Sequence, residues 1–165
     1  MKILGQKAGY IISAVEQFIA ELSDILTSEG QARECCGYLT IMDTATTNGT
    51  VMLISQIGIC PPDKWEKYFR FSQEKAARLQ LKRHDISSWQ SRNEVLDQYG
   101  GAIRTTPGWL ILSFSGLPEL ADEALMLYLA VQLGWMPIGE AMSIASISNN
   151  NYFQKLCGAA QVPIR

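Results

Sequence analysis

Two short apolar segments joined by turn residues are the feature that most constrains the fold of this chain. Residues 37–42 and 50–57 are rich in β-branched and other apolar side chains, which favour extended strands. Between them, Asn48 and Gly49 are residue types that tolerate the positive φ angles of a tight turn. The sequence therefore predicts a β-hairpin, which needs further strands or helices to cover it.

A second pair of extended segments, residues 102–106 and 109–115, occurs later in the chain. Pro107 and Gly108 separate them, and both residue types are typical of turns. Residues 110–114 are largely apolar, as expected of a central strand. We therefore expect a second hairpin that pairs with the first in one antiparallel sheet.

Segments with the helical spacing of apolar residues lie before, between and after these hairpins. In the first of them apolar side chains recur every three or four positions, and Gly30 can end the helix. Pro61 begins the second, because proline fits the first turn of a helix. The expected helices cover residues 11–26, 61–81, 89–98, 119–133, 139–147 and 152–160.

The order helix, hairpin, helix, hairpin, helix predicts the fold class. Amphipathic helices on both sides of a sheet bury both of its faces. We expect an α+β fold, a three-layer α/β/α sandwich around a central antiparallel sheet of about four or five strands. A chain of 165 residues has the size of one domain. We expect a single domain over residues 1–165, in which residues 134–165 form a helical C-terminal extension.

Composition and charge exclude several classes of protein. The longest uncharged apolar run, residues 124–138, has about 15 residues, and a membrane span needs roughly 20. Glu16 and Glu21 interrupt the apolar positions near the N-terminus, which is unlike a secretory signal. We therefore expect no membrane span and a cytoplasmic location. The net charge of −2 lacks the basic excess of nucleic-acid-binding proteins, so no nucleic acid partner is expected.

The four cysteines are expected to be free thiols. They lie at positions 35, 36, 60 and 157, without the C-x-x-C spacing of zinc sites or thioredoxin-type sites. Adjacent Cys35 and Cys36 cannot readily form an unstrained disulfide with each other.

Basic residues concentrate in one stretch of the chain. Between positions 64 and 84 lie half of the fourteen Lys and Arg residues, against only Glu66 and Glu74. One interpretation is a helix face that is exposed to water. The other is a binding surface for a carboxylate or phosphate ligand or an acidic partner, because Lys and Arg form charge-assisted hydrogen bonds with such groups. The basic residues are Lys64, Lys67, Arg70, Lys75, Arg78, Lys82 and Arg83.

Three segments resemble a known family. Residues 67–77 are similar to a helix of the GlcG-like proteins that carries a Lys-Ala pair, and residues 99–103 to their glycine-rich approach to the last hairpin. Residues 113–124 are similar to their strand, Ser-Gly turn and Asp-Glu helix start. The chain thus resembles the GlcG/HbpS-like family, which includes haem-degrading and PduO C-terminal-like proteins, over about residues 37–130. It lacks the family's Val-Asp-x-x-Gly turn in the first hairpin.

The resemblance implies a profilin-like fold, a homodimer or larger oligomer, and binding of haem or a related tetrapyrrole. His84 and Cys60 are then candidate axial ligands of the iron, since imidazole and thiolate are common haem donors and a helix N-terminus lowers the pKa of a thiol. The alternatives are an exposed histidine at the end of a helix and a buried, inert thiol. His84 is the single histidine, which rules out a metal site with two histidines in one subunit.

Glycines and basic side chains complete the candidate site. Gly100, Gly101 and Gly116 can let a ligand approach the backbone closely, although turn geometry also accounts for glycine there. Lys75 and Arg78 can pair with propionates. Complementing a helix dipole is a sufficient role for Asp122 and Glu123. The candidate cofactor-binding residues are His84, Cys60, Lys75, Arg78, Gly100, Gly101, Ser115 and Gly116.

The functional hypothesis is a non-catalytic binding module for a small apolar or anionic ligand, with haem as the leading candidate. No paired acid and base, metal cluster or phosphate loop points to a reaction. The alternative is an adaptor whose C-terminal helices contact another protein through exposed Trp135, Met136 or Tyr152.

Overall fold

A computed structural model describes residues 2–31, 33–105 and 109–159, with side chains from residue 7 onward. The predicted turn at Pro107 and Gly108 lies outside the described residues. The helices are α1 (Lys2–Ser28), α2 (Trp65–Leu81), α3 (Glu119–Gln132), α4 (Ile138–Ser148) and α5 (Asn151–Ala159), with 3-10 turns η1 (Ser88–Ser91) and η2 (Glu94–Leu96). The strands are β1 (Gly37–Asp43), β2 (Thr50–Ile57), β3 (Ala102–Arg104) and β4 (Leu110–Ser115).

The two hairpins form one antiparallel sheet with the strand order β2-β1-β4-β3. β1 and β4 are central, and Leu39 of β1 lies between Ser55 of β2 and Phe114 of β4. Side chains alternate between the two faces of these strands. Leu112 and Phe114 of β4 contribute to one core, and Ile111, the residue before Leu112, contributes to another. The predicted α+β sandwich is confirmed.

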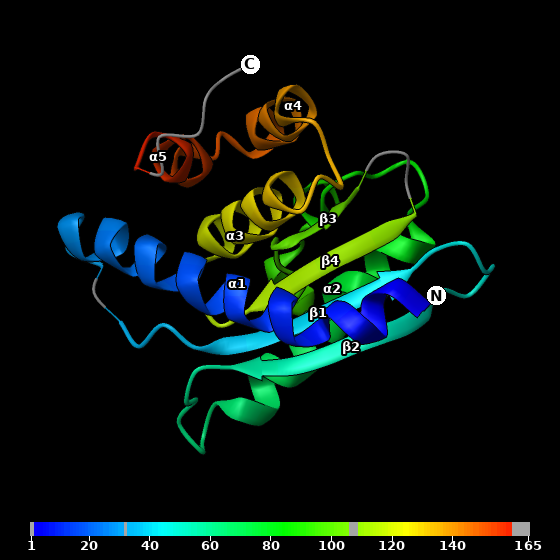
Figure 1. The fold of residues 1–165 in the computed structure, drawn as a ribbon, viewed down its shortest axis with the longest axis horizontal. Coiled ribbons are helices and arrows are strands. Elements are labelled where there is room, and N and C mark those ends of the chain that lie inside the picture. Colours follow the sequence, from blue (N-terminus) through cyan, green and yellow to red (C-terminus); the bar gives the residue numbers. More distant parts are fainter. Residues whose placement is uncertain (1, 32, 106–108, 160–165) are drawn as a thin grey trace.

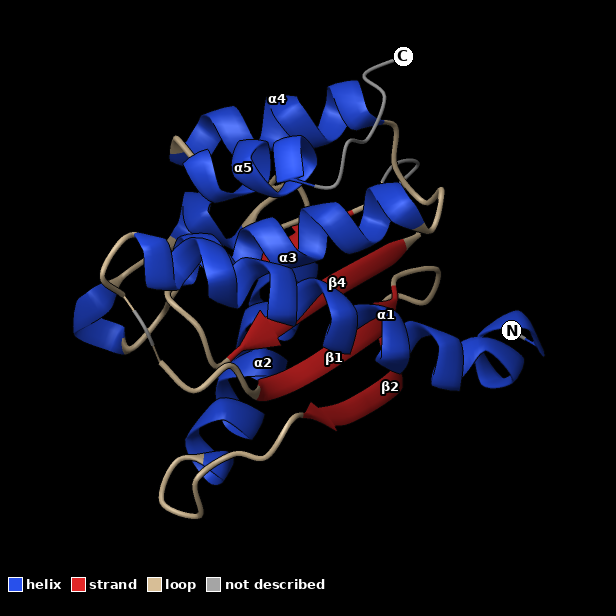
Figure 2. Ribbon diagram, turned by 60° about the vertical axis from the view of Figure 1, so that its left-hand side comes forward, coloured by secondary structure: helices blue, strands red, loops and turns tan. Residues whose placement is uncertain are grey.

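Helices cover both faces of the sheet (Figure 1). α1 and α3 lie side by side on one face and α2 lies on the other, as the second view also shows (Figure 2). A small cluster fills the layer between α2 and the sheet: Met42, Ala76, Leu79, Ala102 and Ile111. The larger core lies between the sheet and the pair α1 and α3.

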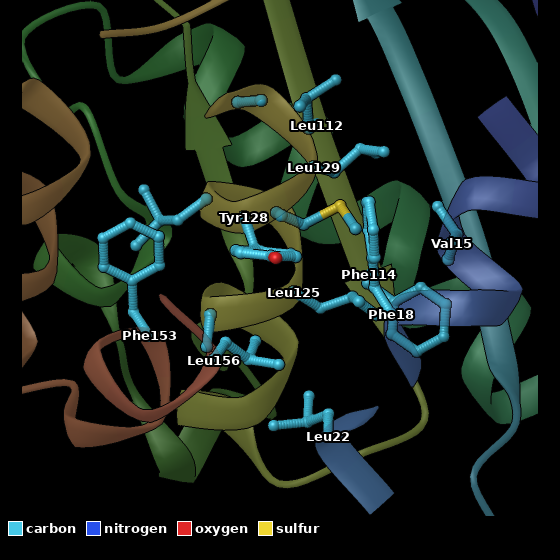
Figure 3. Close-up of a cluster of buried hydrophobic side chains, with 14 of the residues drawn as sticks. Val15, Phe18, Leu22, Leu112, Phe114, Leu125, Tyr128, Leu129, Phe153 and Leu156 are labelled. Atoms are coloured by element: carbon cyan, nitrogen blue, oxygen red, sulfur yellow. The ribbon is translucent and has the colours of Figure 1, made fainter. Parts of the chain in front are cut away.

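The C-terminal helices take part in the larger core. α4 and α5 pack on α3, so that residues 121–130 of α3 are all buried. Phe153 and Leu156 of α5 reach α3 from the side opposite the sheet (Figure 3). Met136 and Tyr152 are buried and Trp135 is half-buried. The expectation that Met136 and Tyr152 are exposed is therefore wrong, because the outer surface of α3 is too apolar to remain uncovered.

Several element boundaries differ from the predicted ones. α1 begins at Lys2, well before residue 11, and α2 begins at Trp65 because residues 62–64 form a turn. Only Gly49 of the predicted pair has a positive φ angle, 69°. The predicted helix over residues 89–98 is replaced by η1 and η2. The side chain of Asn93 accepts a hydrogen bond from the N–H of Val95 and so caps a new turn, η2, which prevents one helix from running through residues 89–98.

Glu123 joins the C-terminal helices to the rest of the fold through a buried carboxylate. Its oxygens accept hydrogen bonds from the hydroxyls of Ser87 (2.6 Å) and Ser148 and from Nδ2 of Asn150 (3.2 Å). No cation among the described residues forms an ion pair with it. Burial raises its pKa; the three donors oppose this effect, and the charge of Glu119 adds to it.

We expect the difference in free energy of unfolding between Glu123→Gln and the wild type to favour the variant more at about pH 8 than at about pH 4. A carboxyl whose pKa is raised by folding contributes stability fully below its ordinary pKa of 4.5, and this contribution is lost as pH rises through the raised value. The amide does not titrate. Urea unfolding at both pH values measures the free energies, and Glu16→Gln on the exposed face of α1 is the control. The same pH dependence in both variants would contradict the prediction.

Candidate functional site

A pocket of about 270 Å³ opens where β4 turns into α3, beside the first half of α2. It contains cationic, anionic and aromatic side chains around the Ser-Gly turn that follows β4. Its lining consists of Arg33, Lys67, Tyr68, Phe71, Lys75, Tyr99, Ser115, Gly116, Leu117, Pro118, Glu119 and Asp122.

A buried ion pair forms the floor of this pocket. Nζ of Lys75 lies 2.8 Å from Oδ2 of Asp122, and both side chains are only 2% exposed. Lys75 also donates to the carbonyl oxygen of Phe114 (2.9 Å), and Oδ1 of Asp122 accepts from the backbone N–H of Leu117 (2.9 Å). The pair therefore connects α2, the end of β4 and the start of α3. Asp122 does more than complement the helix dipole, contrary to the expectation from sequence.

Burial sets the protonation of Asp122. It raises the pKa of this carboxyl to about 6, against the lowering effects of Lys75 and of the Leu117 N–H, while Glu119 adds a small rise. A carboxyl with this pKa is mostly ionised at neutral pH. The negative charge of Asp122 is then taken up by Lys75, which leaves little free charge at the floor of the pocket.

Gly101 lets the start of β3 pass directly over the ion pair. Its φ angle is +117°, and a Cβ there would lie 2.6 Å from Cβ of Asp122 and 2.8 Å from Nζ of Lys75. Gly116 is crowded in the same way, since a Cβ would lie 2.0 Å from the carbonyl oxygen of Cys36. Both glycines therefore allow close contact within the chain itself.

The rim of the pocket carries an excess of positive charge. The carboxylate of Glu119 accepts hydrogen bonds from Nε of Arg92, at 3.0 Å to Oε1 and 2.9 Å to Oε2. Its Oε1 also accepts from the backbone N–H of Gly100 (2.9 Å). Arg33 and Lys67 have no ion-pair partner in the described part of the chain. With Asp122 and Glu119 both paired, these two cations face the pocket without a compensating carboxylate.

Aromatic rings form one wall of the pocket. Phe71 and Tyr99 pack edge to face with their centroids 5.5 Å apart. Nζ of Lys67 lies 5.5 Å from the Phe71 centroid, within range of a cation–π interaction. Tyr68 completes this wall and extends it toward a second cavity.

The second cavity, of about 740 Å³, adjoins the pocket and shares Arg33 and Tyr68 with it. It lies between the loop after α1 and the turn before α2. Its lining holds equal numbers of cations, Arg33 and Lys64, and carboxylates, Glu34 and Asp63, although no ion pair joins them in the described part of the chain. Of these two cavities, only the smaller pocket has more cations than carboxylates in its lining.

The structure brings together four of the predicted binding residues. Lys75, Ser115 and Gly116 line the pocket, and Gly101 packs against its floor. Gly100 lies at the edge, where its N–H binds Glu119. Sequence reasoning missed Arg33, which lies in a loop without a motif, and Tyr68, which lies within the expected helix over residues 61–81 and carries no motif of its own.

Arg78 has a structural role. Its guanidinium donates to the carbonyl oxygens of Ser88 (2.9 Å) and Tyr99 (2.5 Å), to the carbonyl and hydroxyl oxygens of Ser91, and to Glu74. It thereby fastens η1 and the segment before β3 to α2. Arg78 is not among the residues that line the pocket.

His84 and Cys60 lie at opposite ends of α2. The 17 residues of this helix separate its ends by about 25 Å, so the two side chains cannot ligate one iron. His84 is exposed in the loop after α2. Cys60 is buried five residues before α2 begins, and burial, with contributions from Cys36 and Glu34, raises its pKa to about 12. This direction is opposite to the lowering that a helix N-terminus would produce.

Comparison of the chain with protein-family models, curated proteins and solved structures gives no match. The GlcG-like resemblance therefore stays a prediction drawn from three segments. The described residues contain no group of three or more His, Cys, Asp or Glu side chains that could hold a metal ion. No helix among them is long and apolar enough to cross a membrane.

We expect Gly101→Ala to lower the free energy of unfolding by about 3 kcal/mol or more, because overpacking adds to the cost of a positive φ angle. Gly134→Ala is the matched control. Its φ angle is +68° and nothing lies within 4 Å of the added Cβ, so only about 1 kcal/mol should be lost. Denaturant unfolding measures both changes. Equal losses would show that Gly101 is not crowded by the ion pair.

Proposed function

We propose that this protein is a non-catalytic binding module for a small anionic ligand with an aromatic or apolar face. The ligand occupies the pocket above the Lys75–Asp122 pair. The observation that carries the proposal is the position of Arg33 and Lys67, two cations without carboxylate partners, beside the aromatic wall. Such cations form charge-assisted hydrogen bonds with carboxylates, and aromatic rings stack with flat ligands.

The dimensions of the two adjoining cavities support a ligand of moderate size. Pockets for small molecules span about 300–1,000 Å³, and the combined volume of the pocket and its neighbour lies at the upper limit of this range. A planar ligand can place its acidic groups at Arg33 and Lys67 and extend past Tyr68 into the larger cavity. A tetrapyrrole with two propionates, the ligand type that the GlcG-like resemblance implies, has this chemistry. Ligation of its iron by His84 or Cys60 is not part of the proposal.

We expect protoporphyrin IX to bind with saturation, and Lys67→Gln or Arg33→Gln to weaken binding roughly tenfold each, because each removes one charge-assisted hydrogen bond. Porphyrin fluorescence measures the dissociation constants. Lys7→Gln on α1 removes an equal charge far from the pocket and should change nothing. The dimethyl ester of protoporphyrin, which lacks the carboxylates, should bind more weakly than the free acid. Equal affinity of all three variants, or of acid and ester, would contradict the proposal.

We also propose that the protein self-associates through β2, with a second copy as the partner. β2 is an edge strand that contains no charged residue and no proline, two of the features that usually protect an edge. Its pairing with β1 has one register shift, opposite Ile41 and Met42. α2 lies over β1, β4 and β3 and leaves this face of β2 uncovered, whereas α1 contacts β2 on the other face of the sheet. Val51 and Ile54 are consequently 44% and 36% exposed, and Trp65 at the start of α2 is 46% exposed. Antiparallel pairing of two β2 strands about a two-fold axis would join two sheets and cover this surface.

We expect the wild type to sediment as a dimer at micromolar concentration and Ile54→Lys to sediment as a monomer, because the charge would be buried at the two-fold axis. Analytical ultracentrifugation distinguishes the two states. Ile147→Lys on α4 introduces the same charge at a residue of similar exposure (40%) and should leave the dimer intact. A monomeric wild type, or a dimeric Ile54→Lys, would overturn this part of the proposal.

The adaptor hypothesis depended on exposed side chains in the C-terminal segment. Two of its three contact residues, Met136 and Tyr152, are buried, so we do not propose this function.

A further inference from the structure

A separate cavity of about 350 Å³ lies at the C-terminal end of α2. It is lined by the loop of residues 44–47 between β1 and β2, and by Gln80, Arg83 and Arg104. The lining is almost wholly polar, with hydroxyl, amide and guanidinium groups. The pocket above the Lys75–Asp122 pair lies beside the first half of α2, and the two cavities share no lining residue.

Gln80 presents a buried acceptor that the fold does not use. The residue is only 7% exposed, and its Nε2 donates to the carbonyl oxygens of Thr46 (3.4 Å) and Thr47 (3.5 Å). Its Oε1 is buried and has no hydrogen-bond partner within the described residues. A buried unpaired acceptor costs about 1–3 kcal/mol. Gln80 lines the cavity, so an O–H or N–H donor of a ligand there would remove that cost once the amide turns Oε1 toward it.

Two guanidinium groups stand beside this acceptor. Arg104 is held in place by hydrogen bonds from Nη2 to the carbonyl oxygen of Leu79 (2.6 Å) and from Nε to that of Asp85 (3.3 Å). The guanidinium of Arg83 has no hydrogen-bond or ion-pair partner in the described ranges. Burial first, and then the charge of Arg83, lower the pKa of Arg104, whereas Asp85 raises it. Because both guanidinium groups line the same cavity, their charges repel each other, and an anion between them would be favoured.

Two carboxylates lie near the cavity, Asp85 and Asp43, and neither forms an ion pair with Arg83 or Arg104 in the described residues. Oδ1 of Asp43, at the base of the loop, accepts the backbone N–H of Ala45 (2.8 Å) and so shapes the loop. The Thr46 hydroxyl lies 3.3 Å from that of Thr50. The cavity therefore combines paired cations for an oxyanion with an adjacent acceptor for a hydroxyl group.

We propose that this cavity binds a small phosphate ester that carries a hydroxyl group, such as a sugar phosphate. The phosphate lies between Arg83 and Arg104, which match its oxygens with forked N–H donors. The neighbouring hydroxyl donates to Oε1 of Gln80. The volume of about 350 Å³ accommodates a ligand of this size and excludes one much larger.

The test uses the full chain labelled with ¹⁵N and titrated with ribose 5-phosphate, inorganic phosphate and ribose. We expect saturable amide shifts at residues 44–47, 80 and 83, with ribose 5-phosphate binding roughly tenfold more tightly than phosphate, because it adds one hydrogen bond to a buried acceptor. Ribose alone should not saturate. Arg83→Gln, an exposed position, should weaken both anions about tenfold.

A second variant separates the two parts of the ligand. Gln80→Leu removes the acceptor, together with the two long contacts of Nε2 to Thr46 and Thr47, but keeps the bulk of the side chain. Because both arginines remain, phosphate should bind as in the wild type while the preference for ribose 5-phosphate disappears. Lys67→Gln, in the other pocket, should leave both affinities unchanged. The proposal is overturned by the absence of saturable shifts up to roughly 10 mM ligand, by unchanged affinity in Arg83→Gln, or by weakening in Lys67→Gln instead. None of these outcomes bears on porphyrin binding or on self-association.

Discussion

The buried pair of Lys75 and Asp122 is the contact on which the arrangement of the three layers depends. Lys75 comes from the helix on one face of the sheet and Asp122 from the helix on the other, and they meet past the end of β4. Removing either partner would leave an uncompensated charge in the interior, which costs about 3–5 kcal/mol. The pair thus fixes how α2 and α3 are placed relative to the sheet. It also fixes the floor of the pocket, so the candidate binding site and the stability of the fold share one interaction.

The sequence predicted the sheet well because its evidence is local. The predicted strand over residues 50–57 has the same ends as β2, and β1 is one residue longer than the predicted strand, because it ends at Asp43. Short runs of apolar and β-branched residues, and the turn residues that flank them, can be recognised within a few positions of the sequence. The helix over residues 89–98 was wrong for a local reason as well: Ser87 and Asn93 both cap short turns, and two caps in succession end a helix before it forms.

The candidate site was less predictable because charge and burial are decided by contacts distant in sequence. Lys75 and Arg78 looked like part of a basic surface, yet both are buried, one against Asp122 and the other against the carbonyl oxygens around η1. Asp122 and Glu123 looked like ordinary helix-start residues. A signal was present in the apolar run that follows them, since a helix buried on all sides also buries the polar residues of its first turn. Arg33 gave no signal, because its role depends on where its loop lies.

The enclosed position of α3 has a consequence for how the chain matures. This helix forms the centre of the larger core, and its outer side is covered by α5, which leaves the ribosome after every strand of the sheet. Until α5 arrives, a nascent chain exposes an almost continuous apolar helix. Such a surface invites association with other chains or with chaperones during synthesis. Core formation in this protein is therefore a late event, coupled to a segment that contributes no strand to the sheet.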